Sequence, residues 1–541
     1  MKISPLYALA IVFCVLLNSC SKDSPAPSTG PKFITVRDFS LDSKPASTDY
    51  SGTSVTPQVT IEFSEPIDHE SASAAITMAA ATLNYTFSNG DSIVTIQPNT
   101  PLKYLTAYRV VVSDQLKSTT GKSTSGVTNI NIFTKFDPSD KKPRISQDEL
   151  LDLVQKQTIK YFYDYAHPTS GMSRERLNSN NTVTSGGTGF GIMAVIVGME
   201  RDFIPHNDGI NHFNKIVTFL EKTERFHGAW PHWIDGNNGK VIPFSTKDNG
   251  GDLVETSFLV QGLVTLRQYL KPADTVGNNM INRINKLWTG VEWDWYRKNN
   301  EDVLYWHWSP NYNWDMNFPL YGYFEEQITY ILAAASATHG VPKIVYTNGY
   351  GKNGAIVKNN TYYNIKLPLE SPAPLFWVQY SYLGMDPHFN DGYADYWEQN
   401  VNATKINQAY CIANPKKFYG YSDKCWGLTA SDNQQGYSAH SPTNDLGVIS
   451  PTAALSSFPY LPDESMKALE FFYYTLGDKL WGDYGFYDAF NLSSAWFASS
   501  YLAIDQGPIV VMIENQRTGL LWDLFMSAPE VKNAKKLLDL H

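Results

Sequence analysis

The segment DNGGDLVETSFLVQGLVTLRQYL, residues 248–270, joins three acidic residues to a long apolar run with the composition of a buried helix. Asp248, Asp252 and Glu255 are spaced at i, i+4 and i+7. At about 100° per residue, this spacing predicts that their carboxylates lie on one face of a helix. Like charges on one face repel each other, so the spacing favours a cleft in which the carboxylates act on a ligand. The alternative is an exposed first helical turn, where acidic residues favour the helix dipole.

Aromatic residues are abundant in this acidic chain, which has 541 residues, 14 Trp, 33 Tyr and a formal net charge of −10. The length favours two domains with a large core. The negative charge argues against a nucleic-acid partner, because such partners require basic surface patches. Rings beside carboxylates favour sugar binding, since the apolar face of a pyranose stacks on a ring while its hydroxyls bond to acids. Most of the rings are nevertheless expected to fill interfaces between helices.

Residues 1–20 have the pattern of an export signal, with Lys2 before an apolar run over 6–17. That run is too short to span a membrane as a helix. The tetrapeptide Leu-Asn-Ser-Cys that ends at Cys20 resembles a lipoprotein box, which implies cleavage before Cys20 and lipidation of that residue. The Ser/Pro-rich residues 21–31 would form a tether. We therefore expect an exported lipoprotein, periplasmic or at the cell surface, whose lipid alone anchors it at the outer membrane of a Gram-negative bacterium.

Two cysteines remain after removal of the signal, Cys411 and Cys425. In an oxidising compartment they could form a disulfide, and the sequence leaves this open. No matching histidine spacing accompanies them, which argues against a zinc site.

Residues 32–136 alternate apolar and polar side chains in short runs such as VTIEF (59–63) and SIVTIQP (92–98), separated by turn residues. This period of two predicts an all-β sandwich. The pattern resembles bacterial Ig-like domains attached to secreted enzymes. The segment lacks clustered His, Asp or Glu, so we expect a spacer, with a binding role as the alternative. Residues 137–147, charged and proline-containing, are expected to form a linker.

The apolar period changes to 3.6 in residues 148–541, which predicts an all-α domain. A capping box formed by Ser146 and Glu149 opens the first helix. Further helices are predicted near 188–201, 207–226, 252–270, 276–290, 324–339, 372–383, 391–413, 449–459, 462–476, 493–505, 508–527 and 529–540. Paired helices with long aromatic loops favour an (α/α)6 toroid whose loops build one cleft, and the lack of α/β alternation disfavours a doubly wound sheet. A superhelical array of helical pairs is the alternative, although no fixed-period repeat is evident.

Several further side chains are candidates for a sugar site. Trp230 and His232 belong to the rigid turn WPHW, and His232 is expected either to bond sugar hydroxyls or to serve the core. Trp308 and Trp314 lie in an aromatic loop before Glu325. A carboxyl group among aromatic rings is desolvated, and desolvation raises its pKa toward the value that a general acid needs.

Asp488 and Glu514 also fall in apolar or aromatic runs. A buried carboxylate needs a partner, so each is either part of a structural ion pair or a substrate-binding residue in the cleft. The glycine-rich stretch 186–191 lacks the spacing of a phosphate loop, and we expect it to provide close packing at a helix start.

A set of segments that occur in order along residues 150–530 resembles the glycoamylase-like domain of glycoside hydrolase family 144. The segments are TSGGTGFGIMAVIVGMERDFI, FHGAWPHWIDG, DNGGDLVETSFLVQGL, YGYFEEQITYILAAAS, GVISPTAALSSFPYLP, WGDYGFYDAFN and DQGPIVVMIENQRTGLLW. The resemblance implies an (α/α)6 fold and hydrolysis of β-1,2-glucans with inversion. It also implies family acids at Asp248, Asp252, Glu255 and Glu325. It does not imply starch as the substrate, and it does not extend to the Ig-like segment.

We therefore expect an inverting hydrolase of β-1,2-glucans or their oligosaccharides that needs no metal and no organic cofactor. Inversion requires one protonated carboxyl group and one carboxylate about 6.5–9.5 Å apart. We expect Glu325 to be the acid and the acids at 248–255 to supply the base. A monomer that releases sophorose by exo action is expected, and an open-cleft endo-glucanase is the alternative. An alternative of another class is a surface lipoprotein that binds a glycan without cutting it.

Overall fold

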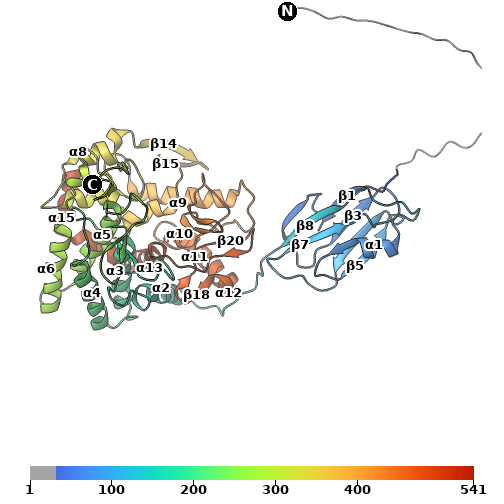
Figure 1. Cartoon of the computed structure of the whole chain (residues 1–541), viewed down its shortest axis with the longest axis horizontal. Helices are drawn as coiled ribbons and strands as arrows, with labels where there is room; N and C mark the ends of the chain where they lie inside the picture. Colours follow the sequence, from blue (N-terminus) through green and yellow to red (C-terminus); the bar gives the residue numbers. More distant parts are fainter. Residues whose placement is uncertain (1–31) are drawn as a thin grey trace, which may run out of the picture. The chain divides into compact units, whose positions relative to one another are not determined.

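The computed structural model describes residues 32–541, and the expected signal peptide, Cys20 and the tether lie outside the described residues. The chain forms two compact units, the smaller from most of residues 32–131 and the larger from most of the chain that follows (Figure 1). Residues 132–136 belong to the larger unit by their contacts. The domain boundary predicted after 136 therefore stays a prediction. Within residues 32–541, no helix combines the length and the hydropathy needed to cross a bilayer.

The smaller unit consists of strands and one short helix: β1 (Val36–Leu41), β2 (Asp49–Thr53), β3 (Val59–Phe63), α1 (His69–Ala75), β4 (Ile76–Met78), β5 (Leu83–Ser88), β6 (Ile93–Pro98), β7 (Ala107–Val112) and β8 (Thr128–Thr134). The strands form two four-stranded sheets, in the orders β1-β3-β6-β5 and β2-β8-β7-β4. Val59, Ile61 and Phe63 of β3 are buried and alternate with half-exposed residues, because successive side chains of a strand face opposite sides of the sheet. The predicted β-rich Ig-like domain is confirmed.

The larger unit is mainly helical. Its α-helices are α2 (Gln147–Tyr163), α3 (Ser185–Glu200), α4 (His206–Leu220), α5 (Leu253–Tyr269), α6 (Thr275–Thr289), α7 (Gln327–Ala335), α8 (Lys343–Val345), α9 (Tyr396–Ala413), α10 (Pro451–Leu455), α11 (Pro462–Glu470), α12 (Gly477–Leu480), α13 (Ala503–Thr518), α14 (Leu520–Ser527) and α15 (Pro529–Leu538). The predicted capping box of α2 is present, with Ser146 and Glu149 bonding to each other's backbone N–H.

Tighter or wider helical turns and short strands occupy the loops of this unit. The turns are η1 (Trp295–Arg297), η2 (Tyr346–Tyr350), η3 (Lys352–Gly354), η4 (Leu375–Val378), η5 (Tyr380–Tyr382) and η6 (Phe471–Thr475). The strands are β9 (Thr182–Thr184), β10 (Trp233–Asp235), β11 (Val241–Ile242), β12 (Gly251–Asp252), β13 (His307–Trp308), β14 (Val357–Tyr362), β15 (Ile365–Leu369), β16 (Ala430–Asn433), β17 (Gly436–Ala439), β18 (Trp481–Gly482), β19 (Gly485–Phe486), β20 (Phe490–Asn491) and β21 (Trp496–Phe497).

Helices α3 and α5 pack directly against each other in the core of the larger unit (Figure 1). Every residue of α3 from Ser185 to Met199 is buried, as expected for a helix that is apolar on all sides. The two backbones touch at glycines. A Cβ on Gly189 would lie 2.1 Å from the Phe258 carbonyl oxygen, and one on Gly262 would lie 2.2 Å from the Gly189 carbonyl oxygen. The packing role predicted for the glycine-rich stretch is thereby confirmed.

The helices around this pair contact one another in a closed series. Helix α5 contacts α7, and α13 contacts both α3 and α10. Turn η5 contacts α7, and Gln379 beside that turn donates hydrogen bonds to the Ala453 carbonyl and the Ser457 hydroxyl, both at 3.1 Å. The series is therefore α3–α5–α7–η5–α10–α13 and back to α3. Helices α2, α4 and α6 pack outside it against α3 or α5.

The prediction of a helix at 493–505 is wrong. Apolar side chains recur there at intervals close to a helical period, but the backbone is extended around the β20–β21 hairpin. The Asp488 N–H donates to the Ser500 carbonyl (3.0 Å), and the Ala498 N–H donates to the Ala489 carbonyl (2.9 Å). Long-range backbone pairing therefore overrides the local pattern.

Two other predicted helices differ in form. The segment 508–527 is divided, because Gly519 adopts a left-handed conformation (φ 74°) that ends α13 before α14 begins. The segment 372–383 is helical only as the turns η4 and η5. Local periodicity predicted where these helical segments lie, but it did not predict the break at Gly519 or the tighter turns of η4 and η5.

Cys411 and Cys425, whose pairing the sequence left open, are free buried thiols. Burial raises the pKa of Cys411 to about 12, so this thiol stays protonated and unreactive at neutral pH. Both cysteines serve as small core residues in this structure.

We expect Gly189→Ala to destabilise the larger unit by about 3 kcal/mol, because the new methyl group has no space between α3 and α5. Thermal unfolding followed by intrinsic fluorescence should show a lower midpoint. Gly477→Ala is the matched control, since a Cβ there has its nearest neighbour, the Phe472 carbonyl oxygen, at 3.9 Å. Equal midpoints for the two variants would contradict the packing argument.

Candidate active site

Asp252 is the N-cap of α5, and its carboxylate accepts a hydrogen bond from the Glu255 N–H (2.9 Å). Such a cap satisfies an N–H group at the helix start. Asp248 precedes the helix, and Asp252 also belongs to strand β12, which pairs with β13 through Asp252 and His307. The prediction that three carboxylates lie on one helix face is therefore wrong, because only Glu255 lies within the helix. Tertiary contacts bring the three acids together.

Two histidines link the buried aspartates. His232 Nδ1 lies 3.2 Å from Asp252 Oδ2. His307 Nε2 lies 3.3 Å from Asp248 Oδ2 and 3.7 Å from Asp252 Oδ2. Burial opposes the charge on Asp252, but the hydrogen bond to His232 and the electrostatic interactions with His307 and His232 outweigh it and lower the pKa of Asp252. Asp252 is thus held as a carboxylate.

His232 is the counter-ion of this group. Burial disfavours its protonation, but the negative charges of Glu255 and Asp252 outweigh burial and raise the pKa of His232 to about 9. Its Nε2 lies 3.9 Å from Glu255 Oε1. At neutral pH an imidazolium therefore stands between Asp252 and Glu255.

Glu255 is positioned by the start of α3. Its Oε2 accepts hydrogen bonds from the Gly186 N–H (2.8 Å) and from the Thr184 hydroxyl (3.3 Å). A Cβ on Gly186 would lie 2.5 Å from that oxygen, so this close contact requires glycine. Burial, assisted by the charge of Asp252, raises the pKa of Glu255. The carboxyl group is therefore rigidly held.

Glu325 lies just before Glu326, the N-cap of α7, and its main-chain carbonyl accepts a hydrogen bond from the Ser381 hydroxyl. Desolvation and the charges of Glu255 and Asp252 raise the pKa of Glu325 to about 8. At neutral pH most of this group is protonated, which is the state that a general acid needs. The prediction that Glu325 is a desolvated acid among aromatic rings agrees with this environment.

A cavity of about 460 Å³ with many aromatic and aliphatic side chains contains Glu255, Glu325, His232 and a third carboxyl group, that of Glu175. Its lining also includes Trp233, Phe244, Phe258, Trp306, Phe376, Tyr380 and Tyr437. Such a combination of ring faces and a few polar groups suits a sugar chain. Asp248 and Asp252 lie behind His232 and do not line the cavity.

Two further hollows share lining residues with this cavity. Trp306 and Glu325 also border one of about 390 Å³ that includes Tyr321. Arg176 and Tyr437 also border another of about 420 Å³. The two hollows share different lining residues with the central cavity, so each adjoins a different part of its wall.

A second group of acids borders this cleft, and the sequence analysis found only one of its members. Asp488 accepts a hydrogen bond from the Asp432 N–H (2.7 Å), and Asp432 forms an ion pair with Arg176 (3.1 Å). The Tyr380 hydroxyl donates to Asp505 (3.2 Å). Burial and the charge of Asp432 raise the pKa of Asp488 to about 7. Asp505 could have been found as an acid in the apolar run DQGPIVVM, whereas Arg176 and Asp432 carry no distinguishing pattern.

Five residues predicted to bind substrate are absent from the lining of the central cavity. Trp230 is 0% exposed, so it cannot stack on a sugar in this structure. Glu514 forms a salt bridge with Arg201 (2.9 Å) and accepts a hydrogen bond from Gln155 (3.1 Å), which is the structural alternative. Asp488 belongs to the second acid group described above.

Trp308 and Trp314, the other two predicted sugar-stacking residues, belong to a separate cluster of rings. Trp308 meets His227 edge to face (4.8 Å), and Trp314 lies 6.4 Å from Trp295. Their predicted stacking role therefore does not concern the cavity of Glu255 and Glu325.

The groups of His232, Asp248 and Asp252 offer three ligand atoms within 4.8 Å of one another, a spacing that a metal ion could use. Asp248 Oδ1 also lacks a hydrogen-bond partner among the described residues. Metal binding requires a neutral imidazole, however, and the neighbouring carboxylates keep His232 protonated to a pKa of about 9. We assign the central positive charge to this imidazolium, and the expected lack of a metal cofactor stays a prediction.

An aromatic cleft in which one carboxyl group, Glu325, is mostly protonated at neutral pH beside a second, Glu255, is typical of glycoside hydrolases. Residues 317–529 match the family model described as "Putative glucoamylase", and residues 40–136 match that of the bacterial Ig-like domain. The first region lies within the larger unit, and the second covers most of the smaller one. The chain belongs to glycoside hydrolase family 144 and carries an N-terminal Ig-like domain.

Three relatives illustrate this membership. The exo beta-1,2-glucooligosaccharide sophorohydrolase (non-reducing end) of Parabacteroides distasonis is 45% identical over 413 residues, which are 72% of this chain and 57% of that protein. The endo-beta-1,2-glucanase of Chitinophaga pinensis, solved with sophorotriose and glucose, is 54% identical, with a TM-score of 0.72, over 74% of this chain and 99% of that one. The beta-1,2-glucanase structure from Parabacteroides distasonis is 36% identical, with a TM-score of 0.71, over 93% of this chain and 73% of that one. The chain thus spans just over half the length of the curated sophorohydrolase.

We expect the purified protein to contain divalent metal only in substoichiometric amounts after dialysis at pH 7, because protonated His232 repels a cation. Elemental analysis measures the content directly. Added Zn²⁺ or Ca²⁺ should leave the thermal midpoint unchanged. One tightly held equivalent of metal, lost on replacing His232 by Ala, would show instead that the site binds an ion.

Proposed function

We propose that this protein is an inverting glycoside hydrolase that cuts β-1,2-glucooligosaccharides and releases sophorose by exo action. The observation that carries the proposal is the pair Glu325 and Glu255, which share one aromatic cavity while desolvation raises the pKa of Glu325 to about 8. The activities named for relatives that are 45% and 54% identical support the β-1,2 linkage. No organic cofactor enters this chemistry.

In the proposed mechanism, Glu325 gives its proton to the glycosidic oxygen as the bond between that oxygen and the anomeric carbon breaks. Glu255 is the member of the 248–255 group that lines the cavity, so we assign it the base. It takes a proton from a water molecule whose oxygen bonds to the anomeric carbon from the opposite face. The imidazolium of His232 favours the ionised form of Glu255, and Asp252 keeps that imidazolium charged.

The helices that carry these acids are proposed to form an (α/α)6 toroid. The closed series α3–α5–α7–η5–α10–α13 would be its inner ring. Helices that precede the members of this series in the chain, such as α2, α4 and α6, would form the outer ring. This arrangement supports a single cleft at the ends where Asp252 and Glu325 precede α5 and α7.

Exo action is favoured by the sophorohydrolase relative, and endo action is the alternative because the relative from Chitinophaga pinensis is an endo-glucanase. The two modes differ in what closes the ends of the cleft. We further propose a monomeric exported lipoprotein, periplasmic or at the cell surface, with the lipid on Cys20 as its contact with the outer membrane and the Ig-like domain as a spacer. The lipoprotein-box pattern at residues 17–20 supports the anchor.

A non-catalytic glycan-binding lipoprotein is the rival proposal. The aromatic lining of the cavity suits binding alone. A pure binder, however, has no need for an acid whose pKa is raised to about 8. The hydrolase is therefore the better explanation of the site.

Glu325→Gln is expected to lower turnover of β-1,2-glucooligosaccharides about 10³-fold, because it removes the proton donor. Since only protonated Glu325 is active, kcat/KM of the unmodified enzyme should fall as pH rises through about 8, the pKa of this group. Glu326→Gln is the control, because burial raises the pKa of Glu326 so far that this neighbour is already neutral. Reducing-end assays over a pH series give both results.

The assignment of the acid and the assignment of the base can each be contradicted independently in this experiment. Near-normal turnover by Glu325→Gln would remove it as the acid. Near-normal turnover by Glu255→Gln, together with inactivity of Asp505→Asn, would move the base to the second acid group.

We expect the protein without residues 1–20 to cut linear β-1,2-glucooligosaccharides and to leave laminarin, cellulose and starch intact, because family membership and the site favour that linkage. Products separated by size over time should show sophorose from the first minutes. An early ladder of intermediate lengths would replace exo by endo action. Binding without any new reducing ends over a day would favour the rival.

A further inference from the structure

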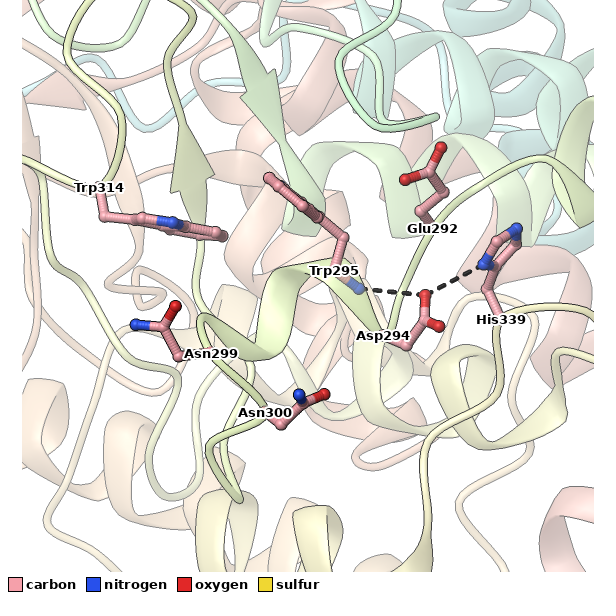
Figure 2. Close-up of a pocket in the computed structure, with 7 residues that line it drawn as sticks. All are labelled: Glu292, Asp294, Trp295, Asn299, Asn300, Trp314 and His339. Atoms are coloured by element: carbon pink, nitrogen blue, oxygen red, sulfur yellow. Dashed lines mark hydrogen bonds and ion pairs between the residues drawn. The ribbon is translucent and has the colours of Figure 1, made fainter.

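A second pocket lies apart from the cleft, in the loops around η1 and after α7, and has a volume of about 340 Å³ (Figure 2). Two tryptophans, two asparagines, two acids and one histidine line it. None of these residues lines the central cavity or either of the two hollows that adjoin it. The pocket is therefore separate from the proposed catalytic site.

The two tryptophans, Trp295 and Trp314, lie along one side of the pocket (Figure 2). Their ring centroids are 6.4 Å apart, and the rings are inclined by 31°. His227 stacks on Trp295 at 3.7 Å and is held by Glu292 through a hydrogen bond of 3.0 Å. Trp295 nevertheless remains 40% exposed. A fixed indole with a free surface is thus presented to solvent.

Polar groups face the tryptophans across the pocket. Asp294 accepts hydrogen bonds from the backbone N–H of Trp295 (3.0 Å) and from His339 Nδ1 (3.1 Å). The bond to His339 joins the start of η1 to the loop after α7. Asn299 and Asn300 both have left-handed backbones, with φ of 61° and 64°.

The asparagine loop is held by Arg297, which donates to the carbonyls of Asn300 and Glu301, both at 2.9 Å. Among the described residues, no group forms a hydrogen bond with the side-chain amide of Asn299 or of Asn300. Two amide groups on a braced loop are therefore free to bond a ligand.

The chemistry of the pocket selects among ligand classes. Glu292 and Asp294 disfavour an anion such as a phosphate. One oxygen of each carboxylate already bonds to His227 or His339, which leaves fewer oxygens free to coordinate a cation. A purely apolar ligand would leave the amides of Asn299 and Asn300 unpaired on contact. A neutral sugar satisfies both kinds of group, because its ring face stacks on indole and its hydroxyls bond to amides and acids.

We propose that this pocket is a secondary binding site for glucosyl units of a neutral β-linked glucan chain, separate from the catalytic cleft. The identity of the sugar rests on the proposed function. Trp308, which belongs to the same ring cluster through His227, pairs with Gly251 next to Asp252. A chain held at the pocket therefore stays close to the loops that carry the proposed catalytic acids, which raises its effective concentration there.

The test uses the Glu325→Gln protein, so that the glucan is not consumed. Affinity electrophoresis and calorimetry are performed with long linear β-1,2-glucan and, separately, with sophorotriose. We expect Trp295→Ala in this background to weaken binding of the long glucan about fivefold, as loss of one stacking surface predicts. Binding of sophorotriose in the cleft should change much less.

Two further variants test the interpretation: one removes a second pocket residue, and the other is a control. Asn299→Gly removes an amide but tolerates the left-handed backbone, so it weakens binding without disturbing the fold. Tyr363→Ala is the control, because this tyrosine is 45% exposed in the turn between β14 and β15 and lines none of the described pockets. It should bind like the Glu325→Gln parent.

The inference is overturned if Trp295→Ala and Asn299→Gly bind long glucan as tightly as the control does. When the unmodified enzyme still cuts β-1,2-glucans, that result removes the secondary site alone. When the unmodified enzyme neither cuts nor binds any β-1,2-glucan, the proposed function fails and takes this inference with it.

Discussion

The direct backbone contact between α3 and α5 is the constraint on which the site depends. Gly189 and Gly262 allow the two helices to touch. At that distance the Gly186 N–H reaches the Glu255 carboxyl group, and Asp252 caps the same helix one turn earlier. A larger residue at any of these glycines would separate the helices and move the carboxyl group relative to Glu325. The close packing of α3 and α5 is therefore also required for the geometry of the site.

Electrostatics then divides the acids by function. His232 and His307 stabilise the charge of Asp252 and lower its pKa, whereas Glu325 has no such partner and its pKa rises to about 8. The negative charge kept on Asp252 itself contributes to the raised pKa of Glu325. The imidazolium of His232 that Asp252 helps to keep charged favours the ionised form of Glu255, the proposed base, while Glu325 stays mostly protonated as the proposed acid. The buried histidines thus matter as much as the carboxylates, although they would contact no scissile bond.

The sequence predicted those features that depend on local chemistry. Asp252, Glu255 and Glu325 stand out because charged residues interrupt apolar runs, and the alternation in β3 reveals a sheet. Features that depend on long-range contacts were missed. The pairing of Asp432 with Asp488 joins residues 56 apart, and backbone bonds around β20 replace the helix predicted at 493–505. Trp230 has the composition of a sugar-binding residue, but only the packed structure shows that it is 0% exposed.

Linkage specificity and mode of action have separate structural origins in this family. Relatives named exo and endo are 45% and 54% identical to the chain, so the residues common to them cannot determine the mode. The acids on α5 and before α7 lie in the central cavity or directly behind it, where the bond would be cut. We expect the mode to depend on the hollows beside that cavity, which are bordered by loop residues such as Tyr321 and Tyr437. Loops can change length and sequence without disturbing the α3–α5 contact, so exo and endo enzymes can share one catalytic centre.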